Sequence, residues 1–588
     1  MNKKIVGSIL VLSILISGIP ALSQTDDAGK EIITSKVKFT EPEIKKIDEY
    51  VSININEATS MTSEASNPIL PIITKTYTFP FGTTINDVKI DFSNPSTMKL
   101  SSDILPALPA QYIATQYQQD SNERERNEEV YSSNNAYPKE SWSIRYGAGL
   151  DGVNHVIYVS IHLCPIVYYP LDNEIDIFSE ATIDITYTNP EHPVQFPDVY
   201  DLLIVSPSEF SLALQPLIDA KEAMGLKSNL INLEDIPQVG LDRQEDVKYY
   251  IKEAIESWGI TYVMLIGNGL KDEEKFPVRY AWVPSGTYEK NFPSDLYYAD
   301  VFNADLSFSS WDNDSDGKYA EFPQDNEAVD LFPDVYLSRI PCTTVEEVDT
   351  VVDKIITYMD SNQMNNKILQ IGGDTFPNDP EKVNEGEYAN NEVMKYLDEY
   401  TSTQIWGSKG NLKRYRILLE MHKGFDFVDF SGHGSYASWA THPPNDESVW
   451  LPKGIGYNGF TYIEPQYYLF NFWKLPVVVF NACSCSKFSE FDSCLSWSFI
   501  KKPMGGAIAS FGASGIGYGS YGTHETERLF GWMEVHLFKE LVETKILGEV
   551  WGTCLNEYII GFELEDADYK TIYEMALFGD PSLVIDNA

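Results

Sequence analysis

The chain has 588 residues, of which 87 are acidic and 43 are lysine or arginine, so its formal net charge is −44. This acidic balance excludes a nucleic-acid-binding protein, which needs a basic face to neutralise phosphates, and it disfavours docking on anionic lipid. Hydrophobic residues make up 43% of the chain and charged residues 22%, a globular composition with room for about two to four domains.

The N-terminus has the pattern of a secretory signal peptide. Lys3 and Lys4 precede an apolar run over residues 5–19, and Ala21-Leu22-Ser23 offers a cleavage site between small residues. The apolar run is shorter than the roughly 20 residues of a membrane span, and no later segment reaches that length. We predict a signal peptide over residues 1–23 and a protein that is secreted, extracellular or at the cell surface, not inserted in the membrane after cleavage. The alternative is an uncleaved anchor.

Residues 24–195 have the pattern of a β-rich domain. Short segments of alternating polarity, such as Val156–Ile161, are separated by proline, asparagine and glycine turns. A polar stretch over residues 118–134 interrupts the pattern and contains Arg124 and Arg126. We expect this stretch to be an exposed loop that is open to proteases.

Beyond a linker at residues 189–193 the pattern changes to short apolar runs that alternate with helical periodicity. This alternation predicts an α/β fold with a mostly parallel sheet covered by helices on both faces. We divide this part into residues 198–360 and 361–588. The expected strands are 202–205, 262–266, 368–371, 425–430, 477–480 and 507–511, and two clear helices are expected at 210–224 and 245–258.

A histidine and a cysteine follow two of these predicted strands. His433 lies in Gly432-His433-Gly434 directly after the strand at 425–430, and Cys483 follows the strand at 477–480, 50 residues later. Ligands of parallel sheets bind beyond the carboxyl ends of the strands, and caspases show a similar His-to-Cys interval. A thiol needs a neighbouring base to act as a nucleophile near neutral pH, and His433 could supply it. The alternative is a turn histidine and a small core cysteine.

The six cysteines are too few for a disulfide scaffold in a chain of this length. Cys485 stands two residues after Cys483 and is a competing nucleophile, because both side chains would point the same way on an extended strand.

At these residues the sequence resembles the C25 peptidases, the gingipain-like members of the caspase-like cysteine peptidases. The resemblance covers roughly residues 198–588, and residues 24–195 look like the propeptide domain of that family. The motifs that carry it are Gly432-His433-Gly434-Ser435 with Trp439, Leu475-Pro476 through Ala482-Cys483, Gly505–Ser510, Phe578–Leu583, and Ser338–Pro341 with Val352–Tyr358.

The resemblance implies a function for each part of the predicted site. Cys483 would be the nucleophile and His433 the general base and acid, and the N–H groups of Gly434 and Cys483 would form an oxyanion hole. Asp374, at the end of another predicted strand, would orient the histidine, or else serve as a turn or helix-capping residue.

Substrate binding is also inferred from the resemblance. Glu387 would be the pocket acid that selects arginine or lysine, with a chance match among 87 acidic residues as the alternative, and Tyr518 would line the pocket wall.

A separate pattern predicts a calcium loop. Asp312, Asp314 and Asp316 alternate ahead of Gly317, which is the spacing of carboxylates around Ca²⁺ in helix–loop–helix sites. Pro323 stands where the usual last glutamate would be, so we expect an isolated structural Ca²⁺ loop, with a solvated acidic loop as the alternative.

Taken together, the sequence predicts a secreted cysteine endopeptidase that is made as a zymogen. Its partners would be protein or peptide substrates and its own prodomain, which would be cut after Arg124 or Arg126. Two alternatives remain open at this stage: a non-catalytic surface or adhesion protein with the same fold, and a peptide ligase or transamidase, in which an amine replaces water in attacking the thioester.

Overall fold

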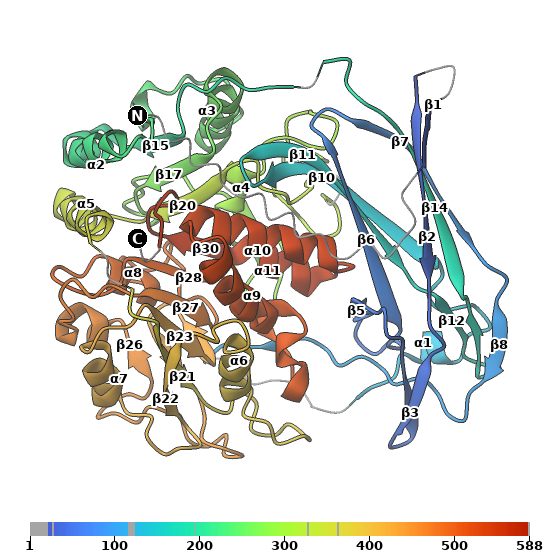
Figure 1. The fold of residues 1–588 in the computed structure, drawn as a ribbon. Coiled ribbons are helices and arrows are strands. Elements are labelled where there is room, and N and C mark those ends of the chain that lie inside the picture. Colours follow the sequence, from blue (N-terminus) through green and yellow to red (C-terminus); the bar gives the residue numbers. More distant parts are fainter. Residues whose placement is uncertain are drawn as a thin grey trace.

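The chain folds into an antiparallel β domain followed by an α/β domain, which lie side by side in the computed structural model (Figure 1). The structure describes residues 22–25, 29–115, 124–192, 194–325, 328–361 and 364–585. The predicted signal peptide therefore lies almost wholly outside the described residues. Among the described residues, no helix has the length and apolar character needed to cross a membrane.

The N-terminal domain is built from two four-stranded antiparallel sheets with smaller strand groups at their ends. Along the strand Glu180–Thr188, half-buried and buried residues alternate without a break, as expected when one face of a sheet packs on a core. The first sheet has the order β1 (Leu22–Thr25), β2 (Glu31–Lys38), β14 (Glu180–Thr188), β7 (Thr84–Phe92), and the second β10 (Trp142–Asp151), β11 (Asn154–Leu163), β6 (Pro71–Pro80), β5 (Ser60–Met61). The smaller groups are β12 (Ile166–Tyr169), β13 (Glu174–Ile177) and β8 (Ser96–Lys99), and the pair β3 (Glu43–Ile47) and β4 (Tyr50–Asn54).

Residues 118–134, which we predicted to be an exposed loop, are held by contacts over part of their length. Residues 118–123 lie outside the described residues, but the short helix α1 (Glu128–Tyr131) follows them. Arg126 is fixed by ion pairs, at 2.6 Å from Asp103 and 2.7 Å from Glu128. Arg124 is half-buried and donates to a backbone carbonyl. The prediction missed these contacts because they join segments far apart in the sequence.

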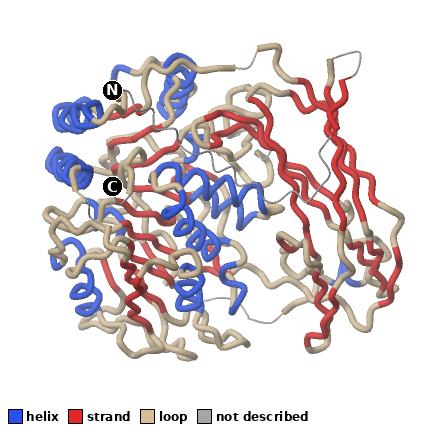
Figure 2. Tube along the Cα trace, viewed as in Figure 1, coloured by secondary structure: helices blue, strands red, loops and turns tan. Residues whose placement is uncertain are grey.

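The α/β domain contains one ten-stranded sheet, which confirms the predicted fold class. Its strands appear in red in Figure 2, with helices in blue on both faces. In spatial order they are β16 (Ser228–Asn232), β15 (Leu202–Ser206), β17 (Tyr262–Ile266), β20 (Tyr336–Ile340), β30 (Met575–Phe578), β28 (Ala509–Ala513), β27 (Val477–Asn481), β23 (Phe427–Ser431), β21 (Lys367–Gly372) and β22 (Thr401–Trp406).

Two parallel halves meet in the middle of this sheet. Strand β30, near the end of the described chain, is parallel to β20 but antiparallel to β28, so the two halves run in opposite directions. The strands that precede the predicted catalytic residues are β21, β23 and β27, which are parallel and end at the same edge of the sheet. They belong to the second half, which runs from β28 to β22 in spatial order. The first half ends at the opposite edge, so the predicted chemistry belongs to the second half.

The helices begin and end close to where the sequence predicts them. Helix α2 spans Ser211–Ala223, and α3 spans Arg243–Trp258, with Asp242 as its N-cap and Gly259 in a left-handed conformation after its last turn. The other longer helices are α5 (Val345–Met359), α6 (Glu385–Val393), α7 (Arg414–Met421), α9 (Leu529–Glu543), α10 (Leu547–Gly561) and α11 (Asp566–Glu574).

The N-terminal domain docks on the α/β domain through the hairpin β10–β11. The backbone of β10 lies directly on Phe332: a Cβ atom added to Gly149 would come within 2.7 Å of the Phe332 side chain. Leu150 N–H donates to Pro333 O, and the Ser160 hydroxyl on β11 donates to Ile560 O near the end of α10. The two domains are therefore joined by buried, sterically specific contacts and not by a loose linker.

Candidate active site

Strand register places His433 beside Cys483. Strands β23 and β27 are parallel neighbours, with Ser431 paired to Asn481, and each predicted catalytic residue follows two positions later. Gly434 then packs on the cysteine so closely that an added Cβ would lie 2.1 Å from Cys483 O. Only glycine fits at this position.

A carbonyl oxygen from the N-terminal domain lies between the two predicted oxyanion-hole donors. Ile113 O accepts a hydrogen bond from Gly434 N at 2.9 Å and another from Cys483 N at 3.3 Å. These are the two N–H groups that the sequence suggests for this role. If these N–H groups form an oxyanion hole, the peptide bond between Ile113 and Ala114 occupies the position of a bond about to be cleaved.

The segment that carries Ile113 crosses the cleft in an extended conformation. Its first part, β9 (Gln111–Tyr112), pairs antiparallel with β29 (Tyr518–Gly519), and Ile113 N–H donates to Gly517 O at 3.2 Å. On the other side Thr115 N–H donates to Gly434 O at 3.1 Å. Main-chain pairing on both sides of the Ile113–Ala114 bond is how proteins bind an extended peptide by strand addition. Residues 111–115 are called the latency segment below.

The imidazole of His433 is held by a backbone carbonyl. Its Nε2–H donates to Thr375 O at 2.7 Å, which fixes the proton on Nε2 and leaves the lone pair on Nδ1. Among the described residues Nδ1 has no hydrogen-bond partner and is buried. Nδ1 is therefore the atom that can accept the thiol proton.

Asp374 does not make the contact that we expected. Its carboxylate accepts from Asn445 N at 2.7 Å, and its backbone pairs with His442. In this state the carbonyl of the next residue, Thr375, holds the histidine, and the orienting role of Asp374 stays a prediction.

Cys483 and Cys485 are not equivalent in the structure. Ser484, between them, has φ 53°, so the chain turns and the alternation expected for an extended strand is lost. The Cys483 thiol donates to Gly517 O at 3.2 Å, beside the latency segment. Cys485 is fully buried, and burial together with Cys494 raises its pKa well above the ordinary thiol value. All six cysteines are free and buried.

Burial under the latency segment keeps both reacting groups neutral. Burial and the neighbouring His442 lower the pKa of His433 to about 3, so its imidazole is uncharged at physiological pH. Burial likewise raises the pKa of the Cys483 thiol well above its usual range. A thiolate–imidazolium pair is disfavoured in this dry cleft, and the structure is that of a latent state.

Two acids bear on the predicted substrate pocket. Glu387, on α6, accepts from the N–H and the hydroxyl of Ser408. Glu525 and Ile113 both lie against the backbone of Gly519. A Cβ atom added to Gly519 would lie 3.0 Å from Glu525 Oε2 and 3.0 Å from Ile113 Cγ2. Burial raises the pKa of Glu525 to about 7. Tyr518 does line the segment: its ring lies 5.0 Å from that of Tyr112.

Glu525 belongs to a buried polar network behind the strand ends. Asn481 Nδ2, at the end of β27, lies 3.0 Å from Glu525 Oε1 and 2.7 Å from Glu534 Oε2. Ser431 donates to the same carboxyl group of Glu534. Glu525 stands in no sequence motif, and only the folded chain brings it under the strands. The one signal of this network in the sequence is Asn481, which ends β27 two residues before Cys483.

The acidic loop brings together three carboxylates, of which one differs from the prediction. Ligand oxygens of Asp312, Asp314 and Asp325 all lie within 4.8 Å of one another. Asp316, the third predicted ligand, instead pairs with Lys318 at 2.7 Å, because the loop turns at Gly317. Oxygens that share one Ca²⁺ at about 2.4 Å stand at most about 4.8 Å apart, so this donor set fits that ion.

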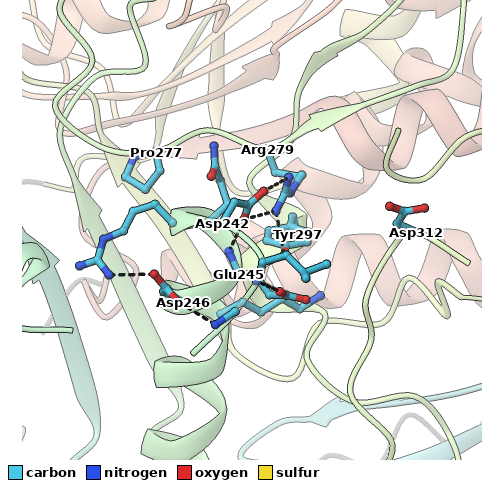
Figure 3. A network of polar contacts seen from close by, with 12 residues as sticks. Asp242, Glu245, Asp246, Pro277, Arg279, Tyr297 and Asp312 are labelled. Carbon is cyan, nitrogen blue, oxygen red and sulfur yellow. Dashed lines mark hydrogen bonds and ion pairs between the residues drawn. The ribbon is translucent and has the colours of Figure 1, made fainter. Parts of the chain in front are cut away.

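The same loop lies beside a polar network at the start of α3. Arg279 forms a two-point ion pair with the N-cap residue Asp242, at 2.9 and 2.8 Å. Figure 3 shows this pair, with Asp312 standing apart from it. The residue before the loop, Trp311, is fully buried and donates to Asp300, so it would report a change in the loop.

Comparison with known proteins gives two family matches that together cover most of the chain. The family described as Peptidase family C25 matches residues 197–586, and the C25 propeptide family matches residues 29–199. A search of curated proteins finds no match.

Several solved structures are similar to this chain. The Arg-specific cysteine proteinase gingipain R matches with 18% identity and a TM-score of 0.48, covering 67% of this chain and 80% of that one. The complex of Porphyromonas gingivalis RgpB pro- and mature domains matches with 18% identity and a TM-score of 0.47, over 66% of this chain and 80% of that one. A gingipain K structure concerned with zymogenic latency, from the same organism, matches with 15% identity and a TM-score of 0.23, covering 29% of this chain and 93% of that one.

The latent geometry predicts a large difference in the reactivity of one thiol. Cys483 should be alkylated by iodoacetamide at least about 100-fold more slowly in the intact chain than after removal of the N-terminal domain, because burial raises the pKa of the thiol and the latency segment covers it. Peptide mapping by mass spectrometry measures the rate at each cysteine. Cys485 is the internal control and should stay unreactive in both forms; equal rates for Cys483 in the two forms would contradict the prediction.

Proposed function

The chain belongs to peptidase family C25 and is a cysteine endopeptidase made as a zymogen, and we propose that Cys483 is its nucleophile and His433 its general base and acid. The observation that carries this proposal is the Ile113 carbonyl, which accepts hydrogen bonds from Gly434 and Cys483. A peptide carbonyl bound between two N–H groups, one of them belonging to the cysteine itself, has the geometry that acyl transfer requires.

In the proposed reaction the thiol proton of Cys483 moves to Nδ1 of His433, and the thiolate attacks the substrate carbonyl carbon. The oxyanion that forms is stabilised by the N–H groups of Gly434 and Cys483, each worth about 3 kcal/mol in comparable sites. His433 then gives its proton to the leaving amine, the C–N bond breaks, and a thioester remains. Water, deprotonated by Nδ1, hydrolyses this thioester and restores the thiol.

Substitution of each cysteine in turn tests the nucleophile. Cys483→Ala and His433→Ala should each lower kcat/KM on a peptide substrate by at least about 10⁴-fold, as removal of catalytic groups does in related mechanisms. Cys485→Ala is the matched control and should stay within about tenfold of the parent. The N-terminal domain has to be removed by an added protease in all variants, because the inactive ones do not process themselves. Loss of activity in Cys485→Ala with retention in Cys483→Ala would reverse the assignment.

We also propose that the enzyme cleaves after arginine or lysine and that Glu525 selects the cation. Its carboxyl group is buried beside Ile113, which occupies the first-residue position, and hydrogen-bonds only to neutral partners. A buried carboxyl group of this kind is complementary to a cationic side chain. This preference also fits the presence of Ile113 in the latency segment. An isoleucine fills the pocket but does not supply the positive charge that Glu525 would select.

The specificity proposal predicts a change in preference and not merely in rate. Glu525→Gln should lower kcat/KM for arginine and lysine peptides by at least about tenfold, while matched norleucine peptides change less, because a buried charge pair is lost only with the cations. Fluorogenic peptides that differ at this one residue provide the measurement. Glu387→Gln is the control and should leave the ratio unchanged. A wild-type preference for uncharged residues would eliminate the proposal.

We propose that Ca²⁺ binds Asp312, Asp314 and Asp325 and rigidifies the loop that follows Trp311. Added Ca²⁺ should raise the melting temperature and change tryptophan fluorescence, and a chelator should reverse both. Asp325→Asn should abolish the response, whereas Asp316→Asn should retain it because Asp316 pairs with Lys318. Indifference of the parent chain to Ca²⁺ would refute the site, and the reverse pattern in the two variants would refute this ligand set.

Export and processing are proposed from the N-terminal pattern and the two arginines. The exported zymogen should begin at Gln24, and the first processing cut should follow Arg124 or Arg126, between the latency segment and β10. Such a cut frees the downstream end of the segment without removing the domain. N-terminal sequencing of secreted and matured protein reads both events; an intact Met1 on the exported protein, or a matured form that still begins at Gln24 with no internal cut, would contradict the proposal.

A further inference from the structure

A cavity of about 190 Å³ opens beside Ala114, the residue that follows the bond in the oxyanion hole. Its wall includes Ser484, Lys487 and Glu490 from the loop after the catalytic cysteine, and two tyrosines, Tyr288 and Tyr436. The cavity therefore belongs to the side of the cleft that holds the leaving group.

The direction of the latency segment assigns this cavity to one substrate residue. Successive side chains of an extended chain point to opposite sides, so Ala114 faces away from the pocket that holds Ile113. Ala114 is buried and lines the cavity, yet it contributes only a methyl group. The space beyond that methyl group is available to a larger residue at the position directly after the scissile bond.

The charged side chains on the cavity wall are Lys487, Glu289 and Glu490. Glu289 is ionised, since Lys570 and Lys487 hold its pKa below the ordinary value although burial opposes this. It lies 2.6 Å from the Lys570 ammonium and 2.9 Å from the Lys487 ammonium. Glu574, also fully buried, lies 3.7 Å from the Lys570 ammonium and is not part of the cavity wall. Lys487 therefore shares Glu289 with a second, fully buried lysine.

The second partner of Lys487 is a side chain at the rim. Glu490 lies 3.6 Å from the Lys487 ammonium and its side chain is 56% exposed. A pair of this length with one partner in solvent contributes little, so an incoming group of the same charge can take its place. The contact with Glu490 shows that Lys487 can pair with a carboxylate on the cavity side.

We propose that this cavity is the subsite for the residue directly after the cleaved bond, that it prefers a carboxylate side chain, and that Lys487 determines this preference by pairing with it in place of Glu490. This inference rests on the proposed function, because it takes the Ile113–Ala114 bond as the model of a cleaved bond. It makes Lys487 a specificity-determining residue that no sequence motif indicates. It also makes Ala114 a residue that leaves the subsite unused in the latent chain.

The test uses the processed enzyme and internally quenched peptides that are identical except for aspartate, asparagine or lysine after the cleaved bond. For the wild type we expect kcat/KM to be about tenfold higher for aspartate than for asparagine, which is the factor that 1.4 kcal/mol gives, and lowest for lysine. Asparagine matches aspartate in shape, so this ratio isolates the charge. Because each ratio is taken within one enzyme preparation, the fraction of folded protein cancels.

Two variants identify the residue responsible. Lys487→Met should reduce the aspartate-to-asparagine ratio to about one, and Glu490→Gln, at the exposed rim, should increase it because the competing carboxylate is gone. A wild-type ratio of one or less, or a ratio that Lys487→Met leaves unchanged, would overturn the inference while the proposed function stands. Failure of the wild type to cleave any of the peptides would instead count against the proposed function and the inference with it.

Discussion

The close approach of Gly434 to Cys483 is the constraint on which the rest of the active site depends. Without a side chain at Gly434, two backbone N–H groups from adjacent strand ends converge on one oxygen atom, and the parallel register of β23 and β27 sets their spacing. In the structure that oxygen belongs to Ile113, so the feature that would stabilise a transition state also holds the latency segment. In the proposed mechanism, catalysis and latency use the same two hydrogen bonds.

The latency segment is short, and the body of the prodomain keeps it in place. The hairpin β10–β11 packs on Phe332 through Gly149, and hydroxyl groups of β6 and β11 donate to the last carbonyls of α10. These contacts lie away from the cleft and do not touch the reacting groups. Once they hold the domain, strand pairing with β29 places the segment across Cys483, and burial makes the thiol and the imidazole neutral. We expect removal of the domain to admit water to the cleft and to allow the charged thiolate–imidazolium pair to form.

The sequence allowed the sheet and the location of its functional edge to be predicted, because both follow from periodicity and from residues at strand ends. His433 and Cys483 could be paired on that basis, since neighbouring parallel strands bring their carboxyl ends together. The acidic residues were harder. Asp374, Glu387 and Asp316 each had a plausible position in the chain, but in the structure Thr375 holds His433, Glu387 accepts from Ser408, and Asp325 lies with Asp312 and Asp314.

These differences share a physical reason. With 87 acidic residues, the chain offers a carboxylate near almost any motif, and which one faces a site depends on backbone turns that have no signature in the sequence. The φ of 53° at Ser484 is one example, because it separates two cysteines that strand alternation would place together. Ile113 is another: a residue outside any motif enters the cleft only because the whole prodomain docks.

Hydrogen exchange at the two oxyanion-hole amides tests the central claim most directly. In the intact chain carrying Cys483→Ala, which cannot process itself, peptides covering residues 431–436 and 481–486 should be protected, and exchange at positions 434 and 483 should accelerate by at least about 100-fold once the prodomain is removed. Equal exchange at these two positions in both forms would show that no carbonyl of the prodomain occupies the hole, and would contradict the account.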